Sequence, residues 1–190
     1  MRLRILLFGL VVGVPLVGVA GPGLTKAPTE VFASKLSDLD IQVTAHQHAV
    51  DQQEIEMGKL AQKSGRAAVK KYGGTLVNDH TAADADLTAF AKKHGLTIPD
   101  DSSPSAAAKK DNEDMIAKLK TLGGADFDHE FLMMMVAGHE REVTKLEADI
   151  AVVENKDLGK LLAKVKPMLQ RHLDSAKTLQ RAAESSNAAR

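Results

Sequence analysis

The chain has 190 residues, 44% hydrophobic and 26% charged, which is the composition of a globular domain with room for a leader rather than of a disordered chain. Its formal net charge is zero and only 3% of its residues are aromatic, which argues against a nucleic-acid-binding surface and favours an all-α core of Ala, Leu, Val and Met. The absence of Cys excludes disulfides, thiolate metal sites and a lipid-modified cysteine anchor.

The N-terminus has the pattern of a secretory leader. Basic residues 1–4 precede an apolar run over residues 5–19, and small residues stand before a cleavage point near Ala20. An uncleaved anchor is the weaker alternative, because about 15 apolar residues interrupted by Pro15 fall short of the roughly 20 that span a bilayer. The sequence therefore predicts a signal peptide over residues 1–20, export to the periplasm or cell envelope, and no transmembrane helix after leader removal.

Helical periodicity follows a predicted flexible tether over residues 21–29. The first long helix is predicted from about Asp38 to Ser64, with Ser37 as its cap. Gly65 breaks the pattern, and a second long helix is predicted over residues 66–94.

A low-complexity stretch over residues 95–111 separates this hairpin from the rest of the chain, and a short helix is predicted over residues 112–122. Two further long helices are predicted over residues 126–154 and 157–183, with Asn155 and Lys156 in a tight turn and Asp157 as a cap.

Two antiparallel hairpins joined by a long crossover are the connectivity of ferritin-like bundles. We therefore predict an all-α, ferritin-like four-helix bundle over residues 30–185, with a short extra helix in the crossover and a tail at residues 186–190. A coiled-coil dimer is the weaker alternative, because the apolar stripes are broad and Ala-rich and lack sustained heptads.

Four polar residues lie on the apolar stripes of the four long helices, namely Glu54, His80, His139 and His172. Each lies between 11 and 17 residues from its hairpin turn, so at about 1.5 Å rise per residue all four reach a similar height. A Glu with three His is a suitable ligand set for one Zn, Cu or Fe ion. The alternative is a metal-free network in which the four groups satisfy one another.

Three carboxylates near the histidines are candidates to orient them. Asp79 and Asp84 lie beside and one turn beyond His80, and Glu142 lies three residues after His139. Solvent exposure is the simpler alternative for Asp79 and Asp84.

Pro167 lies five residues before His172 and removes a backbone donor from the last long helix. The resulting bend either widens a pocket beside the cluster or merely wraps the core. Met135 and Met168, each one turn before a candidate histidine, would suit copper as thioethers, although filling the core is their more common role.

Several segments resemble a bacterial family of exported proteins, domain-of-unknown-function family 4142, often labelled outer-membrane or membrane proteins. The resemblance covers roughly residues 30–182 and is carried by EIEMGKLA (54–61), LVNDHTAAD (76–84), GADFDHEFL (124–132), GHE (138–140) and KPMLQRHL (166–173).

The resemblance implies a place in the ferritin-like superfamily and a location in the envelope, and it implies no biochemical role. It places the family's characteristic polar residues at Glu54, Asp79, His80, Asp128, His139 and His172. The chain lacks the Glu-x-x-His motifs of di-iron ferritins, which argues against dinuclear oxygen chemistry and iron storage.

Two functions agree with these features. The first is storage, buffering or sensing of a single transition-metal ion in the envelope. The second is a structural or stress-related interaction module with a metal-free polar core. The sequence shows no hydrolase triad, phosphate loop or Gly-rich dinucleotide turn, so it favours a protein that is not an enzyme.

Overall fold

The computed structural model describes residues 36–98 and 106–188 and contains five α-helices and no strand in these ranges. The predicted leader (1–20) and tether (21–29) lie outside the described residues, as does part of the crossover. The helices are α1 (Asp38–Ser64), α2 (Ala67–Lys93), α3 (Ala106–Lys120), α4 (Gly124–Val152) and α5 (Lys156–Ala188). The all-α prediction is confirmed for the described residues.

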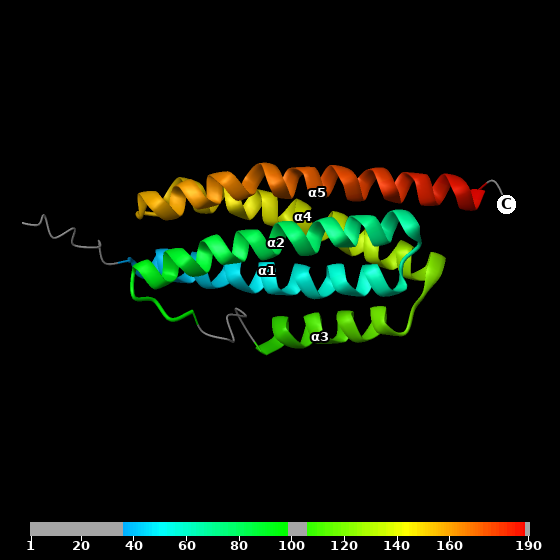
Figure 1. Ribbon diagram of the computed structural model, residues 1–190, viewed down its shortest axis with the longest axis horizontal. Helices are drawn as coiled ribbons and strands as arrows, with labels where there is room; N and C mark the ends of the chain where they lie inside the picture. The colour runs from blue at the N-terminus through cyan, green and yellow to red at the C-terminus, as the bar shows by residue number, and fades with distance from the viewer. Residues whose placement is uncertain (1–35, 99–105, 189–190) are drawn as a thin grey trace, which may run out of the picture. The chain divides into compact units, whose positions relative to one another are not determined.

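Helices α1 and α2 form an antiparallel hairpin with an unusually close approach (Figure 1). A Cβ atom added at Gly58 would lie 2.7 Å from the backbone oxygen of Gly73, and one added at Gly73 would lie 2.6 Å from that of Gly58. Because such distances are far below van der Waals contact, the two glycines allow the helix backbones to touch.

Helices α4 and α5 form the second antiparallel hairpin, which packs against the first through α2–α5 and α1–α4 contacts. Asp40 joins the start of α1 to the turn between α4 and α5, since its Oδ1 accepts hydrogen bonds from the backbone nitrogens of Glu154 (3.0 Å) and Asn155 (3.2 Å). At the other end, Asp128 near the start of α4 accepts from the backbone nitrogen of Arg66 (3.0 Å) and pairs with its guanidinium. These bonds place the beginnings of α2 and α4 at the same end.

Helix α3 runs lengthwise beside the two hairpins and contacts α1 and α4 (Figure 1). The chain leaves the end of α2, travels along α3 and begins α4 at the opposite end. Helices α2 and α4 are therefore parallel to each other, as a long crossover requires.

Local signals set most helix ends. Ser37 and Asp40 form a reciprocal capping box at α1, with both hydrogen bonds at 3.1 Å, as expected from Ser37. At α5 the predicted cap was wrong. The Asn155 side-chain oxygen, not Asp157, accepts from the backbone nitrogens of the first turn, at 3.0 and 3.2 Å.

Two helices are longer than predicted. Helix α3 begins at Ala106 rather than near Asn112, because the segment AAAKK consists of strong helix formers. Helix α5 continues to Ala188 rather than ending near residue 183, because no Gly or Pro follows Pro167 in it.

The apolar interior is divided into two clusters by a polar layer. One cluster centres on Leu76, Phe127 and Phe131, and the other on Leu87 and Leu162. Between them lie buried polar side chains from four helices, namely Gln47, Asp51 and Glu54 of α1, His80 of α2, His139 of α4 and His172 of α5. None of the described helices is both long enough and apolar enough to cross a membrane.

Candidate metal site

Three histidines from three helices meet in the polar layer, namely His80 of α2, His139 of α4 and His172 of α5. They are 0%, 1% and 2% exposed. Their ring centroids are 5.2 Å apart for His80 and His172, 5.5 Å for His139 and His172, and 6.2 Å for His80 and His139. Each ring offers one nitrogen, and these three nitrogens lie within 4.8 Å of one another. Three buried imidazoles so placed could hold a metal ion.

The hydrogen bond of His139 decides which of its nitrogens faces a ligand. Nδ1 lies 2.9 Å from the backbone oxygen of Met135, one turn earlier in α4. A carbonyl only accepts, so Nδ1 carries the proton and Nε2 carries the lone pair. Nε2 is buried and has no hydrogen-bond partner among the described residues.

The other two rings are each held by a carboxylate. His80 Nδ1 lies 2.8 Å from Asp51 Oδ1, and His172 Nε2 lies 2.9 Å from Asp79 Oδ2. The opposite nitrogens, His80 Nε2 and His172 Nδ1, are buried and unpartnered within the described part of the chain. A carboxylate on the far nitrogen is the arrangement that orients metal-binding histidines.

Burial keeps two of the rings neutral. It lowers the pKa of His172 to about 4, although the hydrogen bond to Asp79 acts in the opposite direction. Burial also lowers the pKa of His80, and the charge of Glu54 only partly opposes this. Both imidazoles are therefore neutral near pH 7, which is the form that binds a metal ion.

Burial shifts the pKa of Asp51 in the opposite direction to the pKa values of the two histidines. Burial raises the pKa of its carboxyl to about 8, and the charge of Asp84 adds to the rise. A cation at His80 Nε2 would favour the ionised carboxylate that accepts from Nδ1. The Asp51–His80 pair is therefore suited to release a proton when an ion binds.

A small contraction would bring the three nitrogens onto one ion. Imidazole nitrogens bound tetrahedrally at about 2.0–2.1 Å from a Zn²⁺ ion lie about 3.4 Å from one another. The three nitrogens lie within 4.8 Å of one another, so they would need to move closer together to bind one ion.

Glu54, the fourth predicted ligand, lies beside the histidines rather than among the converging atoms. Its residue exposure is 8%, and its Oε1 lies 3.9 Å from Nδ1 of His139, the nitrogen that already donates to Met135. Its Oε2 is buried without a hydrogen-bond partner in residues 36–98 and 106–188. The structure thus brings together three of the four predicted residues and leaves the carboxylate next to them.

The three predicted orienting carboxylates are placed differently. Asp79 does contact a histidine of the cluster, although this is His172 across the helix interface rather than its neighbour His80. Asp84 instead pairs with His48 and accepts from Gln52, and Glu142 pairs with His46. Neither carboxylate of these outer pairs holds a ring of the cluster.

Asp51 was missed in the sequence, although it is fully buried and holds His80. A signal was present, because Asp51 follows Gln47 by four residues and precedes Glu54 by three, on the same face of α1. Gln47 donates a 3.3 Å hydrogen bond to Asp51 Oδ1. Polar residues at this spacing on an otherwise inward face indicate a buried network.

The fold and the site define an all-helical protein with three buried, converging histidines. The chain belongs to the family described as "Domain of unknown function (DUF4142)", which it matches over residues 25–179. No curated protein and no solved structure matches it.

Proposed function

We propose that this protein is exported and binds a single transition-metal ion, Zn, Cu or Fe, through His80, His139, His172 and Glu54, for storage, buffering or sensing in the envelope. The observation that carries the proposal is the convergence of three buried histidines, one nitrogen of each lying within 4.8 Å of the others. Each ring also has a buried nitrogen without a hydrogen-bond partner among the described residues. Buried polar atoms are normally satisfied, so an unpartnered nitrogen on each of three converging rings favours a bound cation.

The fold supports the same proposal. Two antiparallel hairpins and a lengthwise crossover favour a ferritin-like four-helix bundle, in which metal sites form between facing helices. The N-terminal leader pattern over residues 1–20 supports export.

Glu54 is the proposed fourth ligand. Rotation of its side chain would turn its unpartnered oxygen toward the histidines, and its charge would offset that of the ion. A tetrahedral ion with four protein ligands has no open position for a substrate, which is typical of holding sites rather than catalytic ones.

Elemental mass spectrometry of the purified protein tests the proposal. We expect close to one equivalent of a transition metal in the wild type and its loss in His139→Ala. His129→Ala is the matched control, because His129 is exposed on the same helix. Wild-type protein that is metal-free and gains no metal on exposure to Zn²⁺, Cu²⁺ or Fe²⁺ would leave the metal-free structural module as the better account.

A further inference from the structure

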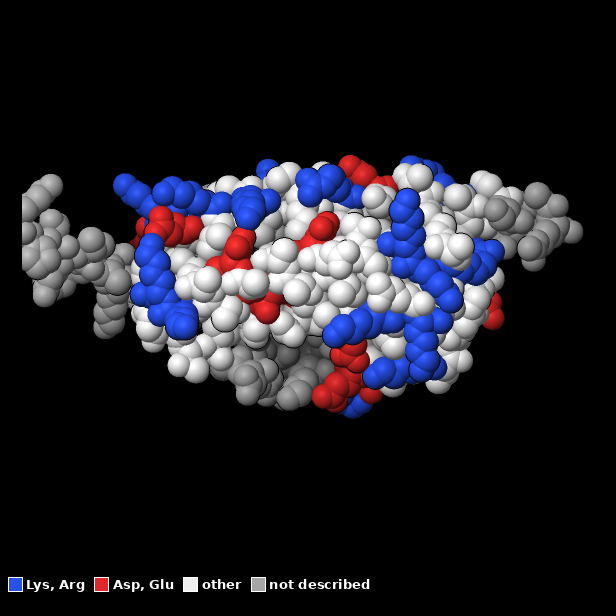
Figure 2. All heavy atoms as spheres, viewed as in Figure 1, with Lys and Arg blue, Asp and Glu red and all other residues white. Residues whose placement is uncertain are grey.

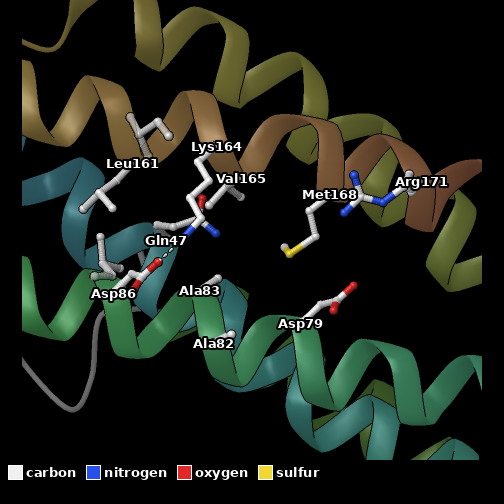
Figure 3. A pocket seen from close by; sticks show the side chains of 12 residues that line it. Gln47, Asp79, Ala82, Ala83, Asp86, Leu161, Lys164, Val165, Met168 and Arg171 are labelled. Atoms are coloured by element: carbon white, nitrogen blue, oxygen red, sulfur yellow. Dashed lines mark hydrogen bonds and ion pairs between the residues drawn. The ribbon is translucent and has the colours of Figure 1, made fainter.

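The three histidines are almost completely buried, so an ion must pass through protein to reach them. A pocket of about 180 Å³ opens between α2 and α5 at the level of the polar layer (Figure 3). Most of its wall is apolar, including Ala83, Leu87 and Val165. A cavity of this size is comparable with ones that admit benzene and is ample for a hydrated ion to lose its water stepwise.

Two side chains of this pocket connect directly to the residues that hold the histidines. Asp79 lines the pocket and accepts the hydrogen bond of His172. Gln47 also lines it and donates to Asp51, which in turn holds His80. The pocket therefore reaches the carboxylate that holds His172 and the amide that donates to the carboxylate holding His80.

Helix α5, which forms one wall of the pocket, contains a proline at the level of the pocket. Pro167 lies between Val165 and Met168, which both line the pocket, and it cannot donate a backbone hydrogen bond. In Figure 3 the Met168 side chain extends from α5 into the space between the helices, and Asp79 reaches toward α5 from the other side. A thioether from α5 and a carboxylate from α2 thus line the pocket on its two sides.

The surface around the pocket carries both signs of charge (Figure 2). Asp86 and Lys164 form a 2.6 Å ion pair that joins α2 to α5 at the rim, and Arg171 also lines the pocket. The ion pair is largely exposed, at 47% and 72% for its side chains, so it is weak and opens readily.

Two further cavities in the described part of the chain do not contact the carboxylates that hold the rings, although one of them is lined by Tyr72, whose hydroxyl donates to the backbone oxygen of His172. One lies between α2 and α5 beside Ala68 and Thr178, and one lies between α1 and α4 beside Ala45 and Lys145. Neither is lined by a side chain that hydrogen-bonds to a ring nitrogen of the three histidines.

Resting on the proposed metal binding, we propose that the α2–α5 pocket is the route by which ions reach and leave the three-histidine site, with the Met168 thioether and the Asp79 carboxylate as groups that an ion passes on its way to the histidines. Blocking such a route raises the free-energy barrier for entry of the ion and for its exit by the same amount. Association and release then slow by the same factor, and affinity stays the same.

The test is stopped-flow mixing of metal-free protein with Co²⁺, followed by release of the bound ion to excess chelator. Ala83→Phe fills the pocket, and we expect both rates to fall by about tenfold or more, which corresponds to about 1.4 kcal/mol of added barrier. Ala68→Phe and Ala45→Phe are the matched controls, since they make the same change in the other two cavities. Both controls should keep wild-type rates.

Ala82→Trp provides a second block at the exposed rim, where folding is least disturbed. Unchanged rates in both blocked variants, or slowing in a control instead, would overturn the route while leaving the metal site intact. A wild type that takes up no Co²⁺ would overturn the metal site itself, and with it the route. A change in affinity with one rate unaffected would show a distorted site rather than a closed path.

Discussion

At the scale of single residues, the chemistry depends on which nitrogen of each ring is held and which is left free. Met135, Asp51 and Asp79 each occupy one nitrogen, and the remaining nitrogens are buried without a hydrogen-bond partner among the described residues. The three partners come from α4, α1 and α2, so the orientation of the rings depends on the packing of the whole set of helices.

We predict that Asp51→Asn weakens metal binding by about 10- to 100-fold, because it removes the carboxylate that, once ionised in the metal-bound state, orients His80 and raises its basicity. Asp84→Asn is the control, since Asp84 also pairs with a histidine, but with His48 outside the cluster. Competition with a chromophoric chelator measures both affinities. Equal losses in the two variants would show that the effect is general electrostatics rather than support of His80.

Asp51 holds a histidine of the cluster and Asp84 does not, and this difference was not evident from the sequence. Helical periodicity shows which side chains face inward, and the distance from a turn gives their height, so the three histidines were found. Periodicity does not show which carboxylate meets which ring across an interface. Asp79 reaches His172 because neighbouring residues on a helix point in different directions, and that pairing depends on helix rotation.

At the scale of helices, the contact between α1 and α2 depends on two glycines. We predict that Gly58→Ala lowers the free energy of unfolding by about 1–3 kcal/mol, because its Cβ would lie 2.7 Å from a backbone oxygen that cannot rotate away. Gly138→Ala in α4 is the control. A Cβ there meets nothing within 4 Å, so we expect a gain of about 0.5–1 kcal/mol from helix propensity.

Urea unfolding of the metal-free proteins measures both changes. If Gly58→Ala were as stable as Gly138→Ala, the close helix approach would not exist in solution.

Asp40 links the start of α1 to the α4–α5 turn, and its charge is the source of a pH dependence. Burial acts to raise its pKa, but hydrogen bonds from Asn155, Ser37 and Glu154 outweigh this and lower the pKa below its ordinary value of 3.8. A lowered carboxyl pKa contributes stability above the unfolded value and loses it as the pH falls below that value.

We therefore predict that Asp40→Asn is less stable than the wild type at pH 7 and that the difference shrinks as the pH falls below about 3.8. Unfolding free energies of the two proteins from pH 7 to pH 3 measure it. A difference that is constant across this range would mean that the charge of Asp40 contributes nothing.

Helix boundaries were predicted best where a residue has one strong local role. Ser37 and Gly65 mark the ends of α1 as expected. The start of α3 and the end of α5 differ from the prediction, because the segment before Asn112 is rich in Ala and Lys, which favour helix, and no Gly or Pro stops α5 after Pro167.

At the scale of the whole molecule, the two apolar clusters and the polar layer between them together make up the interior of the helical bundle. The apolar clusters fix the four long helices against one another, and the histidines lie where both clusters end. An ion bound there would join α2, α4 and α5, and would stabilise the folded protein by mass action because the unfolded chain has no preformed site.

The most direct test of three-histidine binding is X-ray absorption fine structure at the zinc edge, on protein loaded with one equivalent of Zn²⁺. We predict three imidazole nitrogens at about 2.0–2.1 Å from the ion, with the multiple scattering of the rings, together with one carboxylate oxygen. His139→Ala should reduce the imidazole contribution. A shell of oxygens without imidazole scattering, unchanged in His139→Ala, would contradict the proposed site and place the ion elsewhere on the protein.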